Sequence, residues 1–210
     1  RSLLSFLYFC LTASAGYLIK DILDKKEDQL HPLKSHRPIA EGKISTSLAL
    51  SLSLLFFILS LAGIAIMQNI SLLIILMGYI MLNIFYALAI KHLAILDVIS
   101  IALGFELRIW AGAVAINIVP SEWLQVCTFL LALFLGFGKR RAEIAFLKST
   151  AKEHRKVLAD YRLLFLDQLI AICAGLTILA YALYTLSADV INKPGGRYML
   201  YTLIFVVYGI

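Results

Sequence analysis

Three aspartates stand at helical spacing in the long polar stretch at residues 20–43. Asp21, Asp24 and Asp28 follow an i, i+3, i+7 pattern, which places three carboxylates on one face if the preceding apolar helix continues that far. Three like charges on one face repel each other unless a cation lies between them. Mg²⁺ prefers oxygen ligands and combines one or two carboxylates with substrate phosphates. The spacing therefore predicts a Mg²⁺ site, and a solvated acidic helix end is the alternative that the pattern leaves open.

A fourth aspartate opens an apolar segment. Asp97 is the second residue of LDVISIALGFELRIWAGAVA, and Arg108 follows eleven residues later. Eleven residues are close to three helical turns, so both lie on one helix face. Glu106 adds a further charge at membrane depth. Ionisable residues in apolar spans usually face a polar cavity or a partner. An internal salt bridge that fixes helix packing is the alternative for Arg108 and Glu106.

The preceding apolar segment carries a polar stripe. Tyr79, Asn83 and Tyr86 stand at i, i+4, i+7 on a helix that ends at Lys91. Tyrosines are common anchors at membrane interfaces, which is the alternative for Tyr79. We expect Asn83 and Tyr86 to line a polar cavity.

A basic cluster lies at residues 139–141, within GKRRAEIAFLKSTAKEHRKVLADYRLLFLDQL. Clustered Lys and Arg suit phosphate contacts. Glu143 stands four residues after Lys139, a spacing that supports a helix modestly. Tyr161 and Asp167 follow at the start of the next apolar segment and are further cavity-lining candidates.

The composition indicates which elements must position these side chains. The chain is 61% hydrophobic and 15% charged, with a mean hydropathy of +0.90, whereas soluble domains carry about 25% charged residues. Apolar runs of about 20 residues can cross a bilayer core roughly 30 Å thick. Seven apolar runs are present, at residues 3–19, 45–67, 70–90, 97–118, 122–138, 163–186 and 197–210. We predict an all-α, polytopic transmembrane bundle that forms one domain over residues 1–210; the runs do not alternate as the strands of a β-barrel would.

Positive charge gathers in alternate loops. Lys and Arg are frequent in the loops at 20–43 and 139–162 and include Lys91 in the loop at 91–97, while the connections 68–70 and 119–121 have neither and 187–197 has two. The three basic loops then share one side of the membrane, and the positive-inside rule makes that side cytoplasmic. The membrane topology accounts for the net charge of +6. We therefore expect the chain to lie in a lipid bilayer, and we expect no nucleic acid as a partner.

Both ends of the chain are expected to lack helices. The sequence opens at Arg1 without a methionine, and it closes at Ile210 inside an apolar run of about 14 residues, which is short of a full crossing.

Several motifs carry a family resemblance. The run YLIKDILDKKEDQLHPLKSHRPIAEG resembles the first aspartate-rich signature of the UbiA superfamily of intramembrane prenyltransferases. Its tail HPxKxxRPIAxG, the run KHxxxLDxxxxxxGFxLRxxAGA and the motif GKRRAE are similar to one branch of it, the decaprenyl-phosphate phosphoribosyltransferases and their relatives. The motifs occur in the expected order, and the similarity extends through nearly the whole chain.

The resemblance implies a nine-helix bundle with a cavity open to lipid and capped by cytoplasmic loops, in which the seven runs match helices two to eight. It implies Mg²⁺-dependent transfer of phosphoribose from 5-phosphoribosyl diphosphate to a long polyprenyl phosphate, for envelope polysaccharide synthesis, in a bacterial or archaeal cytoplasmic membrane. An alternative within the same fold is prenyl transfer from a prenyl diphosphate to an aromatic or other lipid acceptor. A transporter or scaffold is a third hypothesis, which the lack of internal repeats disfavours.

The resemblance also assigns roles. Asp21, Asp24 and Asp28 would hold one Mg²⁺, directly or through water, and Asp97 would serve a second acidic site. The phosphate contacts would be the basic residues of the motifs, namely Lys34, Arg37, Lys91, Lys139 and Arg140. Arg108 would reach either a phosphate or the ribose.

Two positions depart from the family pattern. Lys20 stands where the family has Asn, and an ammonium group cannot accept or ligate as an amide oxygen can. Lys20 therefore either contacts phosphate, points away from the site, or marks a different substrate. Glu106 stands where the branch suggests an apolar residue. His31 is expected to belong to a turn with Pro32.

Overall fold

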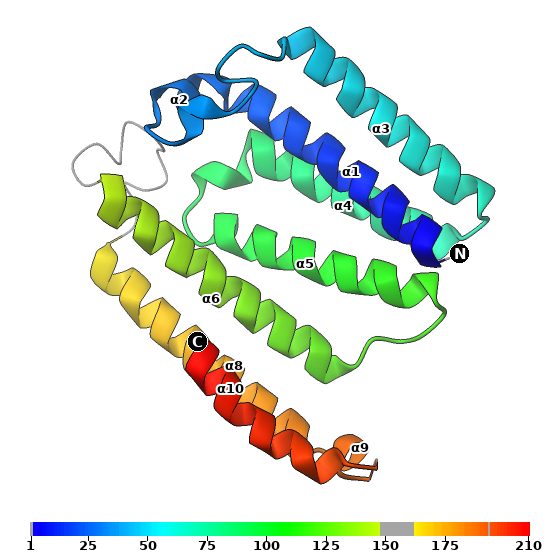
Figure 1. Ribbon diagram of the computed structural model, residues 1–210, viewed down its shortest axis with the longest axis vertical. Coiled ribbons are helices and arrows are strands. Elements are labelled where there is room, and N and C mark those ends of the chain that lie inside the picture. Colours follow the sequence, from blue (N-terminus) through cyan, green and yellow to red (C-terminus); the bar gives the residue numbers. More distant parts are fainter. Residues whose placement is uncertain (1, 148–161, 193) are drawn as a thin grey trace.

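A computed structural model gives the fold and describes residues 2–147, 162–192 and 194–210 (Figure 1). Every regular element within these residues is a helix. Six helices are long and apolar enough to cross a membrane: α1 (Ser2–Leu23), α3 (Thr46–Ile66), α4 (Ile70–Leu88), α5 (Leu96–Ala115), α6 (Glu122–Leu147) and α8 (Leu163–Leu186). The predicted all-α transmembrane bundle is confirmed for the described part of the chain.

Shorter elements connect and follow the long helices. They are α2 (Lys25–Leu30), the 3₁₀ helices η1 (Lys34–His36) and η2 (Ile90–His92), α9 (Ala188–Ile191), the 3₁₀ helix η5 (Gly196–Thr202) and α10 (Leu203–Gly209). Polar side chains begin two of the long helices. Ser45 accepts a hydrogen bond from the Leu48 backbone N–H before α3, and Asn69 accepts one from the Leu72 N–H before α4. Both satisfy a donor that a helix start leaves unpaired.

The seventh apolar run, at 197–210, is not one of the six helices of membrane-crossing length. Residues there form η5 and α10, and both pack against α8, where Figure 1 shows α10 alongside it. Gly195 adopts a left-handed backbone with φ +78° just before η5, which redirects the chain.

Two long helices extend further than predicted. Helix α1 continues to Leu23, so Asp21 is helical. Helix α6 continues to Leu147, so residues 139–147 are helix where a loop was predicted. Lys, Arg, Ala and Glu are good helix formers, and they dominate the start of this stretch. The rest of the predicted loop lies at 148–161, outside the described residues.

Small polar side chains join α1 to α3. Thr12 donates to Ser60 Oγ at 2.9 Å, and Ser53 donates to the Ala15 carbonyl at 3.0 Å. All three hydroxyl-bearing residues are buried. Small residues and buried hydroxyl hydrogen bonds are the usual means by which membrane helices approach closely.

The long helices pack in the order α3, α1, α4, α5, α6, α8 (Figure 1). Large apolar side chains on the outside, such as Ile58, Ile66 and Ile74, are 63%, 81% and 65% exposed, as a hydrocarbon-facing surface requires. The C-terminal end of α1, the segments α2, η1 and η2, and the C-terminal end of α6 meet at one end of the bundle (Figure 1). The fold thus brings the described parts of the three motif segments together.

Candidate active site

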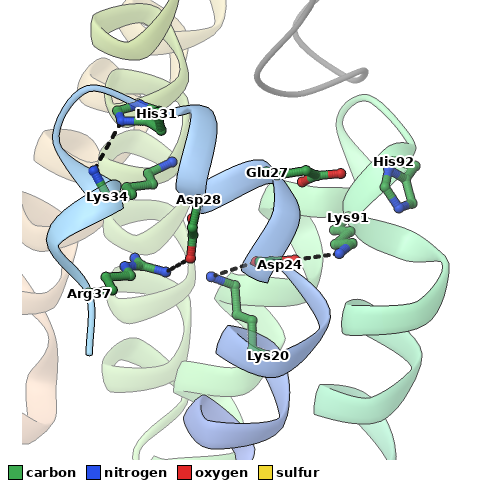
Figure 2. Close-up of a pocket in the computed structure, with 9 residues that line it drawn as sticks. All are labelled: Lys20, Asp24, Glu27, Asp28, His31, Lys34, Arg37, Lys91 and His92. Carbon is green, nitrogen blue, oxygen red and sulfur yellow. Dashed lines mark hydrogen bonds and ion pairs between the residues drawn. The ribbon is translucent and has the colours of Figure 1, made fainter. Parts of the chain in front are cut away.

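A polar pocket lies at this end of the bundle (Figure 2). Nine residues line it: Lys20, Asp24, Glu27, Asp28, His31, Lys34, Arg37, Lys91 and His92. They come from the end of α1, from α2 and η1 with their connections, and from η2. The cavity volume is about 30 Å³, which is room for a water molecule or a small ion. Five predicted site residues therefore meet in one place: Asp24, Asp28, Lys34, Arg37 and Lys91.

Asp24 lies at the junction of α1 and α2 with a cation on each side. Lys91 donates to Asp24 Oδ1 at 2.5 Å, and Lys20 Nζ lies 3.4 Å from Oδ2. Burial raises the pKa of the Asp24 carboxyl, but the hydrogen bond from Lys91 and the charges of both lysines outweigh it. The pKa therefore lies below its usual value of 3.8, and Asp24 is ionised at neutral pH.

Arg37 bridges the other two aspartates of the motif. Its Nη1 donates to Asp21 Oδ1 at 2.8 Å and to Asp28 Oδ2 at 2.9 Å. Asp24 and Asp28 are only 8% and 4% exposed. The alternative of a solvated acidic helix end is therefore wrong for these two residues. Their charges are neutralised within a packed site.

The three aspartates offer oxygen ligands of the kind that Mg²⁺ prefers. As the side chains stand, no three His, Cys, Asp or Glu groups in residues 2–147, 162–192 and 194–210 lie close enough together to hold a metal ion. Arg37 stands between Asp21 and Asp28, and the lysines neutralise Asp24. The donor set fits Mg²⁺ in its chemistry, and the ligand role of these residues stays a prediction.

A chain of ion pairs runs from α5 across α6 to η1. Arg140 Nε donates to Asp97 Oδ2 at 2.7 Å, and Arg140 Nη1 donates to Glu143 Oε2 at 3.1 Å. Lys34 Nζ donates to Glu143 Oε1 at 2.6 Å. We call these four residues the Asp97–Lys34 chain; it fixes the segment of Lys34 to two transmembrane helices.

Asp97 and Arg140 are 0% and 2% exposed, and neither lines the pocket. Asp97 and Arg140 are paired with each other in the structure. A direct contact of either residue with substrate or metal therefore stays a prediction. Lys139 is exposed on α6, where the charges of Lys20 and Lys34 act on it. Tyr86 is partly buried and interacts electrostatically with Arg140.

Arg108 lies apart from the pocket residues. It stands eleven residues after Asp97 on α5, about 16 Å along the helix. Its Nη2 donates to Tyr79 Oη at 2.6 Å, and its guanidinium lies 5.2 Å from the centre of the Tyr79 ring and 5.0 Å from that of Phe105. Among the described residues Arg108 forms no salt bridge, so these contacts with Tyr79 and Phe105 hold it in place, and its contact with a phosphate or ribose stays a prediction. Glu106 Oε1 is buried without a hydrogen-bond partner among the described residues.

The remaining candidates lie outside the pocket. Asn83 donates from Nδ2 to the Tyr79 carbonyl at 2.8 Å, one turn earlier on α4. Asp167 pairs with Arg141 at 2.5 Å, and both side chains are nearly half exposed, so this pair joins α6 to α8 at the surface. Tyr161 lies outside the described residues.

Three residues of the site were not predicted: Glu27, His92 and Glu143. Glu27 falls within the aspartate motif and His92 follows Lys91 directly, so their positions could have indicated them. Glu143 was assigned to Lys139 by its spacing, and only the fold reveals that Lys34 and Arg140 are its partners. His31 is confirmed in a turn, because its Nδ1 accepts from the backbone N–H groups of Leu33 and Lys34 at 3.1 and 3.3 Å.

Comparisons with known proteins agree with the fold. A UbiA homolog from Archaeoglobus fulgidus bound to GPP and Mg²⁺ superposes with a TM-score of 0.79 at 20% identity, covering 100% of this chain and 75% of the homolog. The same homolog bound to DMAPP and Mg²⁺ gives a TM-score of 0.78 at 21% identity, covering 99% and 74%.

Curated relatives extend the comparison to sequence. The decaprenyl-phosphate phosphoribosyltransferase of Mycolicibacterium smegmatis is 35% identical over 188 residues, which is 90% of this chain and 59% of the relative. The Corynebacterium glutamicum enzyme of the same name is 33% identical over 183 residues, or 86% and 55%. The chain thus spans less than two thirds of the length of these relatives. The model of the UbiA prenyltransferase family matches residues 1–210, and the described residues contain six apolar helices of membrane-crossing length. The chain is therefore an integral, multi-pass membrane protein that belongs to the UbiA prenyltransferase family.

Proposed function

We propose that this chain forms the membrane core of a Mg²⁺-dependent transferase that moves phosphoribose from 5-phosphoribosyl diphosphate to a long polyprenyl phosphate, for envelope polysaccharide synthesis. The observation that carries the proposal is the pocket in which buried Asp24 and Asp28 face Lys34, Arg37 and Lys91. Carboxylates beside cations suit a metal-bound diphosphate, because the acids hold the metal and the bases hold the phosphate oxygens. The relatives named above support the phosphoribosyl donor.

The reaction needs positioning and charge neutralisation. The bond between the anomeric carbon and the diphosphate oxygen breaks, diphosphate leaves with the electron pair, and a phosphate oxygen of the acceptor forms the new bond to that carbon. Asp21, Asp24 and Asp28 would hold Mg²⁺, which when bound neutralises charge on the leaving diphosphate. Lys91 and Arg37 would turn from the carboxylates to the phosphate oxygens. Preorganised charges of this kind stabilise a developing anion without a covalent intermediate.

The basic end of the bundle would face the cytoplasm. The motif segments gather at this end, and the positive-inside rule assigns basic loops to the cytoplasmic side. A soluble donor such as phosphoribosyl diphosphate would then reach the pocket from the cytoplasm of a bacterium or archaeon, while the polyprenyl acceptor would approach from the bilayer.

The family name favours a second candidate, transfer of a prenyl group from a prenyl diphosphate to an aromatic or other lipid acceptor.

Membranes that contain the protein can be supplied with Mg²⁺ and either labelled phosphoribosyl diphosphate or a labelled prenyl diphosphate. We expect the ribosyl label to enter the lipid phase with polyprenyl phosphate as acceptor, and EDTA to prevent it. Incorporation of the prenyl label alone would favour the second candidate, and no incorporation from either donor would contradict both.

A further inference from the structure

The pocket contains two polar side chains that the ion-pair network does not use. Most of its lining residues are already paired within the site, namely Lys20, Asp24, Asp28, His31, Lys34, Arg37 and Lys91. Glu27 has no hydrogen bond or ion pair within the described residues. His92 has a buried Nδ1 without a partner in the same part of the chain. These two groups can therefore bind a ligand without breaking a contact.

Glu27 and His92 face each other across the pocket. Glu27 projects from α2 toward His92 of η2, and both side chains lie above the Asp24–Lys91 pair in Figure 2. Both side chains are partly buried. A buried polar atom without a partner costs free energy, so the pair suits a ligand that supplies hydrogen-bonding groups at this point.

The chemistry of the pair favours hydroxyl groups over phosphate. A carboxylate accepts hydrogen bonds from hydroxyls and repels phosphate oxygens, while a neutral imidazole offers one donor and one acceptor. The cations of the pocket serve the diphosphate. In a phosphoribosyl donor the atoms next to the diphosphate carry hydroxyls, whereas a prenyl diphosphate has only hydrocarbon there.

We propose that Glu27 and His92 bind the ribose hydroxyls of the donor and make the pocket selective for a hydroxylated sugar diphosphate over a prenyl diphosphate. This inference rests on the proposed function, because it names the groups that recognise its donor. A site built to hydrogen-bond a hydroxyl disfavours a ligand that lacks it, since its polar groups then stay unpaired.

The test compares two ligands of the same pocket. In Glu27→Gln and His92→Phe, the KM for phosphoribosyl diphosphate should rise about ten- to a hundredfold, the effect of losing a hydrogen bond to a charged or buried group. The inhibition constant of inorganic diphosphate with Mg²⁺ should stay within about twofold of the wild-type value. Glu41→Gln is the matched control, because it makes the same change at an exposed residue paired only with Lys43 in the described structure; it should alter neither constant.

The outcomes separate the two proposals. A wild-type protein that transfers no phosphoribose contradicts the proposed function itself. If the wild type is active but the variants bind phosphoribosyl diphosphate and inorganic diphosphate equally weakly, only the hydroxyl role is overturned. The same holds if the variants bind both ligands as well as the wild type does. A higher Mg²⁺ requirement in Glu27→Gln, with diphosphate inhibition weakened, would also overturn it, because Glu27 would then be a metal ligand.

Discussion

Arg140 of α6 and Asp97 of α5 form a buried ion pair, with 2.7 Å between Nε and Oδ2 and side-chain exposures of 3% and 0%. The pair joins two adjacent transmembrane helices at the pocket end. Its second guanidinium contact, to Glu143, continues to Lys34 in η1. Arg140, which the family resemblance assigned to a phosphate contact, thus connects the helices that support the pocket.

Asp97→Asn should destabilise the protein because it leaves the buried Arg140 without its main counter-charge. Removing one partner of a buried pair costs about 3–5 kcal/mol, which thermal unfolding in detergent would show as a clear loss of stability. Asp167→Asn is the control, because it removes an exposed pair at the surface of α6 and α8 and should change the melting temperature little. If Asp97→Asn is as stable as the wild type and yet inactive, Asp97 acts on the ligand.

The sequence was sufficient for the fold class and for part of the site. Continuous apolar runs indicated the six long helices of the described structure. The charge pattern predicted that the motif segments lie at one end of the bundle. Asp24 and Asp28 were singled out by helical spacing alone, and both line the pocket because Asp24 stands between α1 and α2 and Asp28 lies one turn later in α2. Lys34, Arg37 and Lys91 came from their resemblance to family motifs.

The partners of these residues could not be read from the sequence. Arg140 lies 43 residues from Asp97, and Lys34 lies 109 residues from Glu143, so no local periodicity connects them. The spacing of Asp97 and Arg108 correctly predicted that both lie on one face of a helix. The two residues are nevertheless about 16 Å apart along α5, so they cannot share one small site. The last apolar run is divided between the 3₁₀ helix η5 and the α-helix α10, a change of helix type that hydropathy does not report.

Asp24→Asn should abolish turnover in a protein that still folds but is less stable, because Lys91, only 7% exposed, loses its counter-charge. The amide keeps an acceptor for Lys91 but loses the charge that a divalent cation requires. Turnover should also stop when EDTA removes divalent cations from the wild type, and it should return when Mg²⁺ is added. Detergent gel filtration would check the fold of the variant. Activity that survives both Asp24→Asn and EDTA would remove the basis for a metal at this motif.

Lys20→Asn restores the residue that the family pattern has before the first aspartate. Lys20 lies 3.4 Å from Asp24, whereas Lys91 is closer at 2.5 Å, so Asp24 keeps its main counter-charge. We expect turnover equal to or above that of the wild type, measured with phosphoribosyl diphosphate at saturating Mg²⁺. A complete loss in a folded variant would show that the ammonium group has its own role, such as a phosphate contact.

The orientation in the membrane can be tested with two engineered cysteines at opposite ends of the bundle. Lys43, which is 67% exposed at its side chain, is the last residue of the first motif segment, and Ser121 is exposed in the connection between α5 and α6. If basic loops lie in the cytoplasm, a membrane-impermeant thiol reagent should label Lys43→Cys only in inverted vesicles and Ser121→Cys in intact cells. The parent protein, with Cys10, Cys127 and Cys173, measures the background. The opposite pattern would place the pocket on the outer side, where a donor made in the cytoplasm could not reach it without transport.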